Sequence, residues 1–221
     1  MRTFFYIDGF NFYYGCLKNS PHKWLDLQAF CQTLIDPSEA VTKIRYFTAP
    51  VKPPAHDPKQ DQRQKIYLNA LKTHIPQSLL EIHYGTFLKT QLFARLVKPI
   101  AGKKKALIHR TEEKGSDVSL AVHMVNDAWC DVYDRAVIVS NDSDLQDALK
   151  TIRTYHPNKK LWVASPQAEV SHVLRQYAHH VSTIRQHNLS RSQLPSPIPG
   201  TAYFKPQSWQ SPPPRKAMKE T

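Results

Sequence analysis

The chain has 221 residues, of which 41% are hydrophobic, so it is long enough to bury one sizeable core. Lys and Arg number 30 against 18 Asp and Glu, and the formal net charge of +12 favours a polyanion or an anionic membrane surface as a partner. The N-terminal apolar run is too short for a signal peptide, and no run approaches the roughly 18 apolar residues of a membrane span. We therefore expect an unexported protein that does not cross a membrane.

The cysteines indicate the redox environment of the protein. Cys16, Cys31 and Cys130 are an odd number and lie far apart, without a CxxC pair that would indicate a zinc ribbon or a redox site. A reduced, cytoplasmic environment fits this pattern best.

The first half of the chain predicts strands that alternate with helices. Residues 4–7 are a short apolar run of β-formers that ends at Asp8-Gly9, which is typical of a buried strand followed by a turn. Residues 85–110 mix apolar and basic side chains and predict an irregular or hairpin insertion. The other predicted elements are helices at 11–17, 25–35 and 60–73 and strands at 43–48 and 80–84.

The second half continues this alternation up to residue 184. Residues 116–130 carry apolar side chains at intervals of three and four, which predicts an amphipathic helix, and residues 136–139 predict a buried strand. The sequence from Ser143 to Gln146 has the form of a capping box that opens a helix. That helix is predicted to end near 153, and the remaining elements are strands at 161–164 and 181–184 and a helix at 167–177.

Strands alternating with helices predict an α/β fold, with a central parallel sheet covered by helices on both faces. From residue 188 the pattern stops, because repeated prolines prevent regular structure and few apolar residues remain to be buried. We therefore expect one domain over residues 1–187 and a proline-rich, basic, disordered tail over residues 188–221.

Four aspartates are predicted to meet at one edge of this sheet. Asp8 ends the first strand, while Asp142 and Asp144 follow the strand 136–139. Asp117 opens the preceding helix, and the ligand site of such sheets lies beyond the carboxyl ends of the strands. Because clustered carboxylates repel one another unless a cation neutralises them, the pattern indicates a Mg²⁺ or Mn²⁺ site suited to phosphodiester hydrolysis.

Each aspartate also has a purely structural interpretation. Asp144 and Asp117 could complement helix dipoles, and Asp142 could close an Asx turn. Asp8 differs, because an unpaired carboxylate directly after a buried strand is costly and needs a partner. Only the four residues together favour a catalytic function.

Three blocks of the sequence resemble the signatures of the NYN domain family, the LabA-like branch of the PIN-like nucleases. They are residues 6–11 (Tyr-Ile-Asp-Gly-Phe-Asn), 112–118 (Glu-Glu-Lys-Gly-Ser-Asp-Val) and 139–145 (Val-Ser-Asn-Asp-Ser-Asp-Leu). The resemblance spans residues 1 to about 185 and implies a Rossmann-like PIN-type fold, an acidic Mg²⁺ or Mn²⁺ site, and RNA as substrate. It places the four aspartates at the acidic positions of the family.

The resemblance also assigns supporting residues. Asn11 and Ser140 match polar positions flanking the site, and Asn141 lies between Ser140 and Asp142. Apart from the resemblance, Lys114 is a cation beside the carboxylates that could hold a phosphate or offset local charge. The chain departs from many relatives at His123, where they carry an acid. His123 is interpreted as a half-exposed helix residue.

A second set of residues is a candidate RNA groove. Lys103, Lys104, Lys105 and Arg110 precede the acidic helix and could follow an RNA backbone, with Tyr13, Tyr14 and Phe93 as base-stacking surfaces. The leading hypothesis is a metal-dependent endoribonuclease. The alternative is a non-catalytic RNA-binding or regulatory module of the same fold, and both a monomer and a homodimer are compatible with the sequence.

Overall fold

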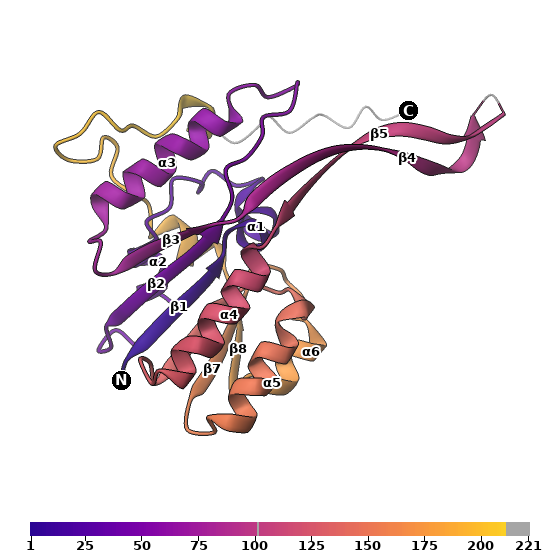
Figure 1. Cartoon of the computed structure of the whole chain (residues 1–221). Helices are drawn as coiled ribbons and strands as arrows, with labels where there is room; N and C mark the ends of the chain where they lie inside the picture. Colours follow the sequence, from indigo (N-terminus) through magenta and orange to yellow (C-terminus); the bar gives the residue numbers. More distant parts are fainter. Residues whose placement is uncertain (101, 211–221) are drawn as a thin grey trace, which may run out of the picture.

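Six parallel strands form the centre of the computed structural model, which describes residues 1–100 and 102–210 (Figure 1). The sheet order is β3-β2-β1-β6-β7-β8, and every neighbouring pair is parallel. The predicted α/β fold with a central parallel sheet is therefore confirmed. The strands are β1 Thr3–Asp8, β2 Val41–Thr48, β3 Leu80–Tyr84, β6 Arg135–Val139, β7 Lys160–Ser165 and β8 His180–Thr183.

The strand order reverses between β1 and β6. The chain first builds outward from β1 through β2 to β3, and later builds in the other direction from β6 through β7 to β8. In the register of the central pair, Ile7 of β1 lies opposite Val139 of β6, so the two strands end side by side. Segments that leave these two carboxyl ends diverge, and such a switch point is where ligands bind in open α/β sheets.

Side chains alternate between the two faces of β1, and each face has its own core. Phe5 and Ile7 pack in a cluster with α2 and α3, while Phe4 and Tyr6 pack in a second cluster with α4 and α5. Helices thus cover both faces, and none within the described residues is long and apolar enough to cross a membrane. The helices are α1 Gly9–Phe12, α2 Leu27–Gln32, α3 Gln60–His74, α4 Ser116–Trp129, α5 Gln146–Tyr155, α6 His172–Tyr177 and α7 Gln186–Ser190, with a π-helical turn Tyr13–Leu17 and 3-10 turns Ser143–Leu145 and Gln207–Trp209.

A long hairpin projects from the domain. Strands β4 (Thr86–Ile100) and β5 (Lys103–Lys114) pair with each other in an antiparallel, two-stranded sheet that is separate from the central sheet. Figure 1 shows this hairpin, which we call the arm, extending away from the helices. Of the two alternatives that the sequence left open for residues 85–110, an irregular insertion and a hairpin, the structure has the hairpin. Both ends of the arm join the domain at the carboxyl edge of the sheet, between β3 and α4.

Packed structure continues past residue 187, where the sequence predicts the domain to end. Leu189, Leu194 and Ile198 are buried in the core cluster that contains α2 and α3. The Trp24 indole donates to the Pro195 carbonyl at 3.0 Å, so the segment is held by a hydrogen bond as well as by apolar contacts. Residues 188–210 are mostly irregular, as the prolines predict, and residues 211–221 of the expected tail lie outside the described residues.

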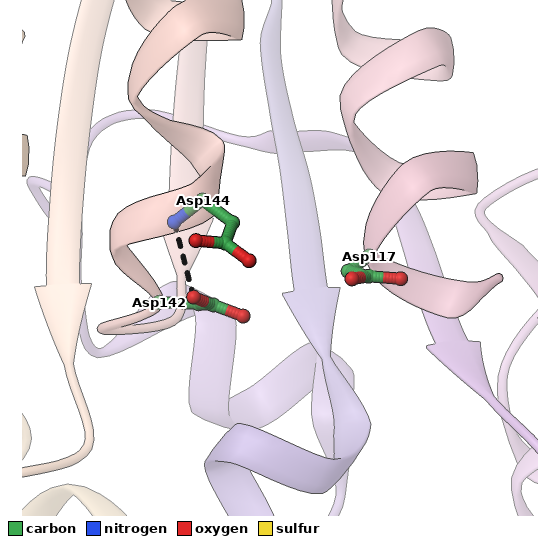
Figure 2. A group of neighbouring side chains, drawn as sticks. All are labelled: Asp117, Asp142 and Asp144. Atoms are coloured by element: carbon green, nitrogen blue, oxygen red, sulfur yellow. Dashed lines mark hydrogen bonds between the residues drawn. The ribbon is translucent and has the colours of Figure 1, made fainter. Parts of the chain in front are cut away.

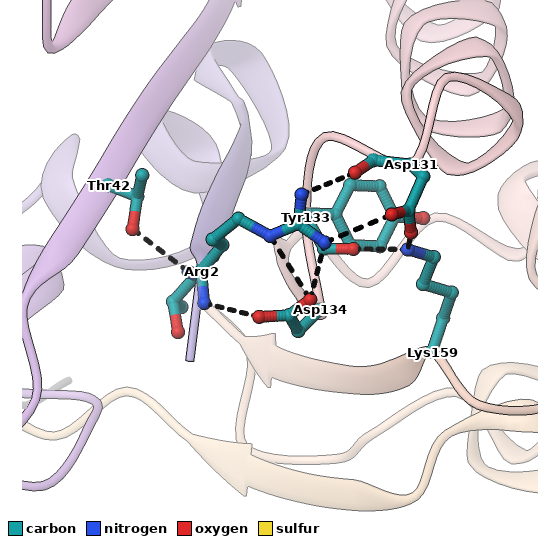
Figure 3. Close-up of polar contacts among 7 residues, drawn as sticks. Arg2, Thr42, Asp131, Tyr133, Asp134 and Lys159 are labelled. Carbon is teal, nitrogen blue, oxygen red and sulfur yellow. Dashed lines mark hydrogen bonds and ion pairs between the residues drawn. The ribbon is translucent and has the colours of Figure 1, made fainter.

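The opposite, amino-terminal end of the sheet is held by ion pairs (Figure 3). Arg2 donates to the Asp134 carboxylate at 2.6 Å and also contacts Asp131, and Lys159 pairs with Asp131. The Arg2 hydrogen bonds lower the pKa of Asp134 to about 2. These contacts join the start of β1 to the segments before β6 and β7, at the end of the sheet remote from the predicted site.

Candidate metal centre

Asp8 lies at the floor of a cleft at the switch point. One carboxylate oxygen accepts the Asn11 backbone N–H at 3.0 Å, which caps α1, and the other accepts the Ser140 hydroxyl at 3.0 Å. Burial raises the pKa of the Asp8 carboxyl, these two hydrogen bonds oppose the rise, and the nearby carboxylates of Asp142 and Glu113 add to it. The sequence predicted that this buried acid needs a partner, and its partners are the Asn11 N–H and the Ser140 hydroxyl.

Asp142 and Asp144 lie on the turn between β6 and α5. The Asp142 carboxylate accepts the Asp144 backbone N–H at 3.1 Å and so caps the 3-10 turn Ser143–Leu145. The predicted capping box from Ser143 to Gln146 is wrong, because the cap is Asp142. Ser140 supports the same turn, since its hydroxyl oxygen accepts the Asp142 backbone N–H at 3.1 Å.

Asp117 approaches from the other side of the switch point, in the first turn of α4. This helix starts after Gly115, whose φ of 93° is in the left-handed region where glycine is favoured. Figure 2 shows Asp117 at the start of its helix, across from Asp142 and Asp144. One carboxylate oxygen from each of these three residues lies within 4.8 Å of the others, and three such oxygens could hold a metal ion.

The cleft has a volume of about 280 Å³, and Asp8 is among the residues that line it. Its lining includes Asp8, Asp117 and Asp142, so three of the predicted acids share one cavity, and Asp144 joins them through the metal-ligand cluster. The described residues include no salt bridge to any of the four aspartates. The site is thus a region of concentrated negative charge in a basic protein.

Asn11 and Asn141 connect the acidic turn to its surroundings. The Asn11 side-chain oxygen accepts the Asn141 backbone N–H at 3.0 Å, and the Asn141 amide donates to Gln167 and to the Glu169 carbonyl. The Asn141 side-chain oxygen also accepts the Ser171 backbone N–H at 2.7 Å. These contacts hold residues 166–171 as a loop against the site, which is why α6 begins at His172 and not at residue 167 as predicted.

Glu113 is a site residue that the sequence analysis did not single out. It lines the cleft from the base of the arm, and one of its carboxylate oxygens accepts the Ser116 backbone N–H at 3.1 Å. Phe10, Tyr14 and Gln167 also line the cleft. Glu113 stands two residues before Gly115, in a block that resembles the family signature, so its position could have indicated a role. Where its side chain points depends on how the arm joins α4, which the sequence does not show.

The predicted cationic residues lie along the arm and not in the acidic cleft. Lys114, at the base, pairs with Glu112 at 3.4 Å, and Arg110 forms an ion pair with the same glutamate. Lys103, Lys104 and Lys105 are exposed at the start of β5, towards the outer end of the arm (Figure 1). Any contact of these lysines with a polyanion would therefore be remote from the aspartates.

His123 lies on α4 but away from the acidic cluster. Its ring packs against His83, with the ring centroids 4.2 Å apart, and against Phe47. Next to the two histidines, Arg45 binds the buried Asp127 with two hydrogen bonds. The Tyr6 hydroxyl also donates to Asp127, at 2.6 Å. His123, at which the chain departs from the family, is therefore part of a polar cluster between α4 and the sheet.

The chain is similar to known proteins in sequence and in fold. The chain is 33% identical to a protein of Pseudomonas putida (strain DSM 28022 / S16) named 6-hydroxy-3-succinoylpyridine 3-monooxygenase HspA, over 95% of this chain and 75% of that relative. A crystal structure of a protein of unknown function from Vibrio parahaemolyticus RIMD 2210633 has a similar fold, with a TM-score of 0.50 and 20% identity, over 87% of this chain and 96% of that one. The family model described as NYN domain matches residues 2–185, which include all four aspartates and the switch point. The chain therefore belongs to the NYN domain family.

Proposed function

We propose that this protein is a metal-dependent ribonuclease that hydrolyses phosphodiester bonds of single-stranded or looped RNA with Mg²⁺ or Mn²⁺. The observation that carries the proposal is the convergence of Asp117, Asp142 and Asp144 at the switch point of an NYN domain. Members of this PIN-like nuclease family act on RNA, and the basic net charge of +12 suits a polyanionic substrate.

The donor set fits a hard divalent cation. All three candidate ligands are carboxylates, and oxygen ligands are those that Mg²⁺ and Mn²⁺ prefer. A bound ion would lower the pKa of a coordinated water and offset the charge of the phosphate. Hydrogen bonds within the chain hold the carboxylates in place. Ser140 and the Asn11 N–H fix the orientation of Asp8, and the capped turn fixes Asp142. Such preorganisation lowers the cost of assembling the reacting groups.

The arm is the proposed contact for the rest of the RNA. Residues 86–114 contain eight Lys and Arg against two Glu, so much of the positive charge of the chain lies on this hairpin. Because the arm starts and ends at the carboxyl edge of the sheet, an RNA strand that follows it reaches the acidic cleft.

A second candidate function is oxygenation of a hydroxypyridine acid. It is favoured by one observation, the 33% identity to the relative named 6-hydroxy-3-succinoylpyridine 3-monooxygenase. A monooxygenase places one atom of O₂ in its substrate and reduces the other to water, so it consumes two electrons from a reductant. Incubation with this pyridine, O₂ and a reductant, followed by mass spectrometry, tests it: a product 16 mass units heavier, or its breakdown products, supports oxygenation.

RNA cleavage tests the leading proposal. Purified protein is incubated with end-labelled single-stranded RNA in Mg²⁺ or Mn²⁺, with EDTA as the metal-free condition. We expect the wild type to cleave the RNA, and both EDTA and Asp142→Asn to abolish cleavage. Asp147→Asn, which changes an exposed acid on the next helix, should leave cleavage intact. RNA that is bound but uncut across both metal titrations would instead support the non-catalytic RNA-binding module.

A further inference from the structure

A second cavity lies directly beside the acidic cleft and is walled by aromatic side chains. We call it the aromatic cavity; its walls include Tyr13, Tyr46, Tyr67 and Trp209, and it encloses about 90 Å³. The rings come from four segments: the π-helical turn, β2, α3 and the C-terminal 3-10 turn. Aromatic walls suit a planar ring, because base and ring faces stack favourably on tyrosine and tryptophan.

The C-terminal segment completes this cavity. Trp209 packs edge-on against Tyr67, with ring centroids 6.0 Å apart, and also against Trp24 at 6.5 Å. Lys205 fixes the same segment, since its ammonium donates to the Pro21 carbonyl at 3.0 Å. The part of the chain that the sequence predicted to be a tail is thus a wall of a cavity.

Cations gather at this cavity with little acid to balance them. Lys23 and Arg63 line it, and Lys205 lies close to Lys23. Arg63 pairs with Asp57, whereas within the described residues neither lysine has a carboxylate partner, and the Lys23 ammonium donates only to the Ser20 carbonyl. Burial lowers the pKa of Lys23, and the charges of Lys205 and Arg63 lower it further. An anionic group would relieve this repulsion.

The aromatic cavity and the acidic cleft share a wall. Phe10 and Tyr14 line both of them, and Gly9 of the cavity directly follows Asp8 of the cleft. A β-carbon on residue 9 would lie 2.7 Å from the Phe47 carbonyl oxygen, so only glycine allows this close approach of α1 to β2. Phe87, at the base of the arm, packs edge-on against Phe10 with ring centroids 5.3 Å apart.

We propose that the aromatic cavity binds one base of the RNA, next to the phosphodiester that the acidic cleft receives, and that Lys23 and Arg63 bind the adjoining phosphate. This inference rests on the proposed ribonuclease function. The aromatic walls match a base, and the two lining cations, of which Lys23 has no carboxylate partner within the described residues, match a phosphate. The shared Phe10–Tyr14 wall puts this nucleotide next to the acidic cleft.

Calorimetric titration of the full-length protein in EDTA tests this inference without any need for cleavage. The probes are cytidine and uridine 5′-monophosphate, adenosine 5′-monophosphate, and pyridine-3-carboxylate as a free aromatic acid. We expect all three nucleotides to bind, because every base has a face that can stack on an aromatic ring.

Two pairs of variants identify the cavity as the place of binding. Arg63→Gln removes a lining cation, and Lys65→Gln removes an exposed cation from the same helix. Trp209→Leu removes a ring of the wall, and Phe204→Leu removes a 57% exposed ring from the same segment. The first member of each pair should weaken nucleotide binding roughly tenfold, and the second should leave it unchanged.

The remaining outcomes overturn the inference. One is that the nucleotides do not bind. Another is that they bind Arg63→Gln and Trp209→Leu as tightly as the wild type, and a third is that pyridine-3-carboxylate binds more tightly than any of the nucleotides. The last result would assign the cavity to a free aromatic acid. RNA cleavage without nucleotide binding would overturn only this inference, whereas nucleotide binding without RNA cleavage would overturn only the proposed ribonuclease function.

Discussion

The Ser140 hydroxyl donates to the Asp8 carboxylate at 3.0 Å, across 132 residues of sequence. The same hydroxyl oxygen accepts the Asp142 backbone N–H at 3.1 Å, so one buried serine links the acid that ends β1 to the acidic turn after β6. These are the two strands between which the sheet order reverses. A single hydroxyl therefore sets the spacing of carboxylates from two halves of the fold.

Ser140→Ala tests the importance of this link. It leaves an Asp8 oxygen without its partner at a buried position, which costs about 1–3 kcal/mol, and it also removes the acceptor of the half-buried Asp142 N–H. We expect the free energy of unfolding, measured in urea, to fall by about 1–3 kcal/mol, with a weaker affinity for Mn²⁺. Ser143→Ala, at an exposed hydroxyl on the same turn, is the control. Equal stability of the two variants would show that Ser140 has no such role.

Asp117→Asn should have opposite effects with and without metal. Removing one charge from the cluster relieves repulsion, so in EDTA we expect the variant to be more stable than the wild type. In Mn²⁺ the wild type should gain stability, about 2.7 kcal/mol at a hundred times its Kd, and the variant should gain much less. Thermal unfolding of both proteins, with Asp147→Asn as the control, measures this. Equal stabilisation by Mn²⁺ in all three would contradict it.

The His83–His123 pair predicts a pH dependence of stability. Burial lowers the pKa of both rings below the ordinary 6.5, and the neighbouring charges of Arg45, Glu81 and Asp127 also act on them. The unfolded chain therefore binds more protons than the folded one below pH 6.5, so this contribution is complete above that pH and is lost as the pH falls through the folded pKa values.

Replacement of both histidines by glutamine should flatten this dependence. We expect urea unfolding between pH 7 and pH 5 to show a smaller loss of stability in the double variant than in the wild type, whatever the absolute stability of each. The same loss of stability in both proteins would mean that other groups cause it.

The arm lysines predict a salt dependence of RNA binding. Replacing Lys103, Lys104 and Lys105 with glutamine removes three exposed cations, and each phosphate contact on single-stranded RNA contributes about 0.7 to the slope of log K against log salt. The magnitude of the slope should therefore fall by about 2, while the cleavage of RNA already bound is retained. A triple variant at Lys52, Lys150 and Lys160, which are exposed outside the arm, is the control. Identical slopes for the two triple variants would exclude the arm as the contact.

The meeting of Asp8 and Asp142 could be predicted because both lie just after strands. Asp8 directly follows an apolar run, Asp142 follows another after Ser140 and Asn141, and the carboxyl ends of adjacent parallel strands meet at one edge. Glu113 could not be placed in the same way, because its direction depends on the junction between the arm and α4. The capping error has a similar origin. Ser143 and Asp142 are both good caps by composition, and the fold selects Asp142, which Ser140 holds in place.

The C-terminal segment shows the other limit of sequence patterns. Leu189, Leu194, Ile198 and Trp209 are separated by irregular intervals and by prolines, so no helical or strand period connects them. They pack because Trp24 and the α2–α3 side of the sheet offer apolar surface, which only the tertiary structure reveals. The aromatic cavity depends on this packing and was therefore hidden from the sequence.

The most direct test of the account is a crystal of the wild-type protein soaked in Mn²⁺ and measured near the manganese absorption edge. We predict an anomalous peak between the carboxylates of Asp117, Asp142 and Asp144, beside Asp8, and loss of that peak in Asp117→Asn. A fully soaked crystal with no peak among these aspartates, or with peaks only elsewhere on the protein, would contradict the proposal that they form a metal centre.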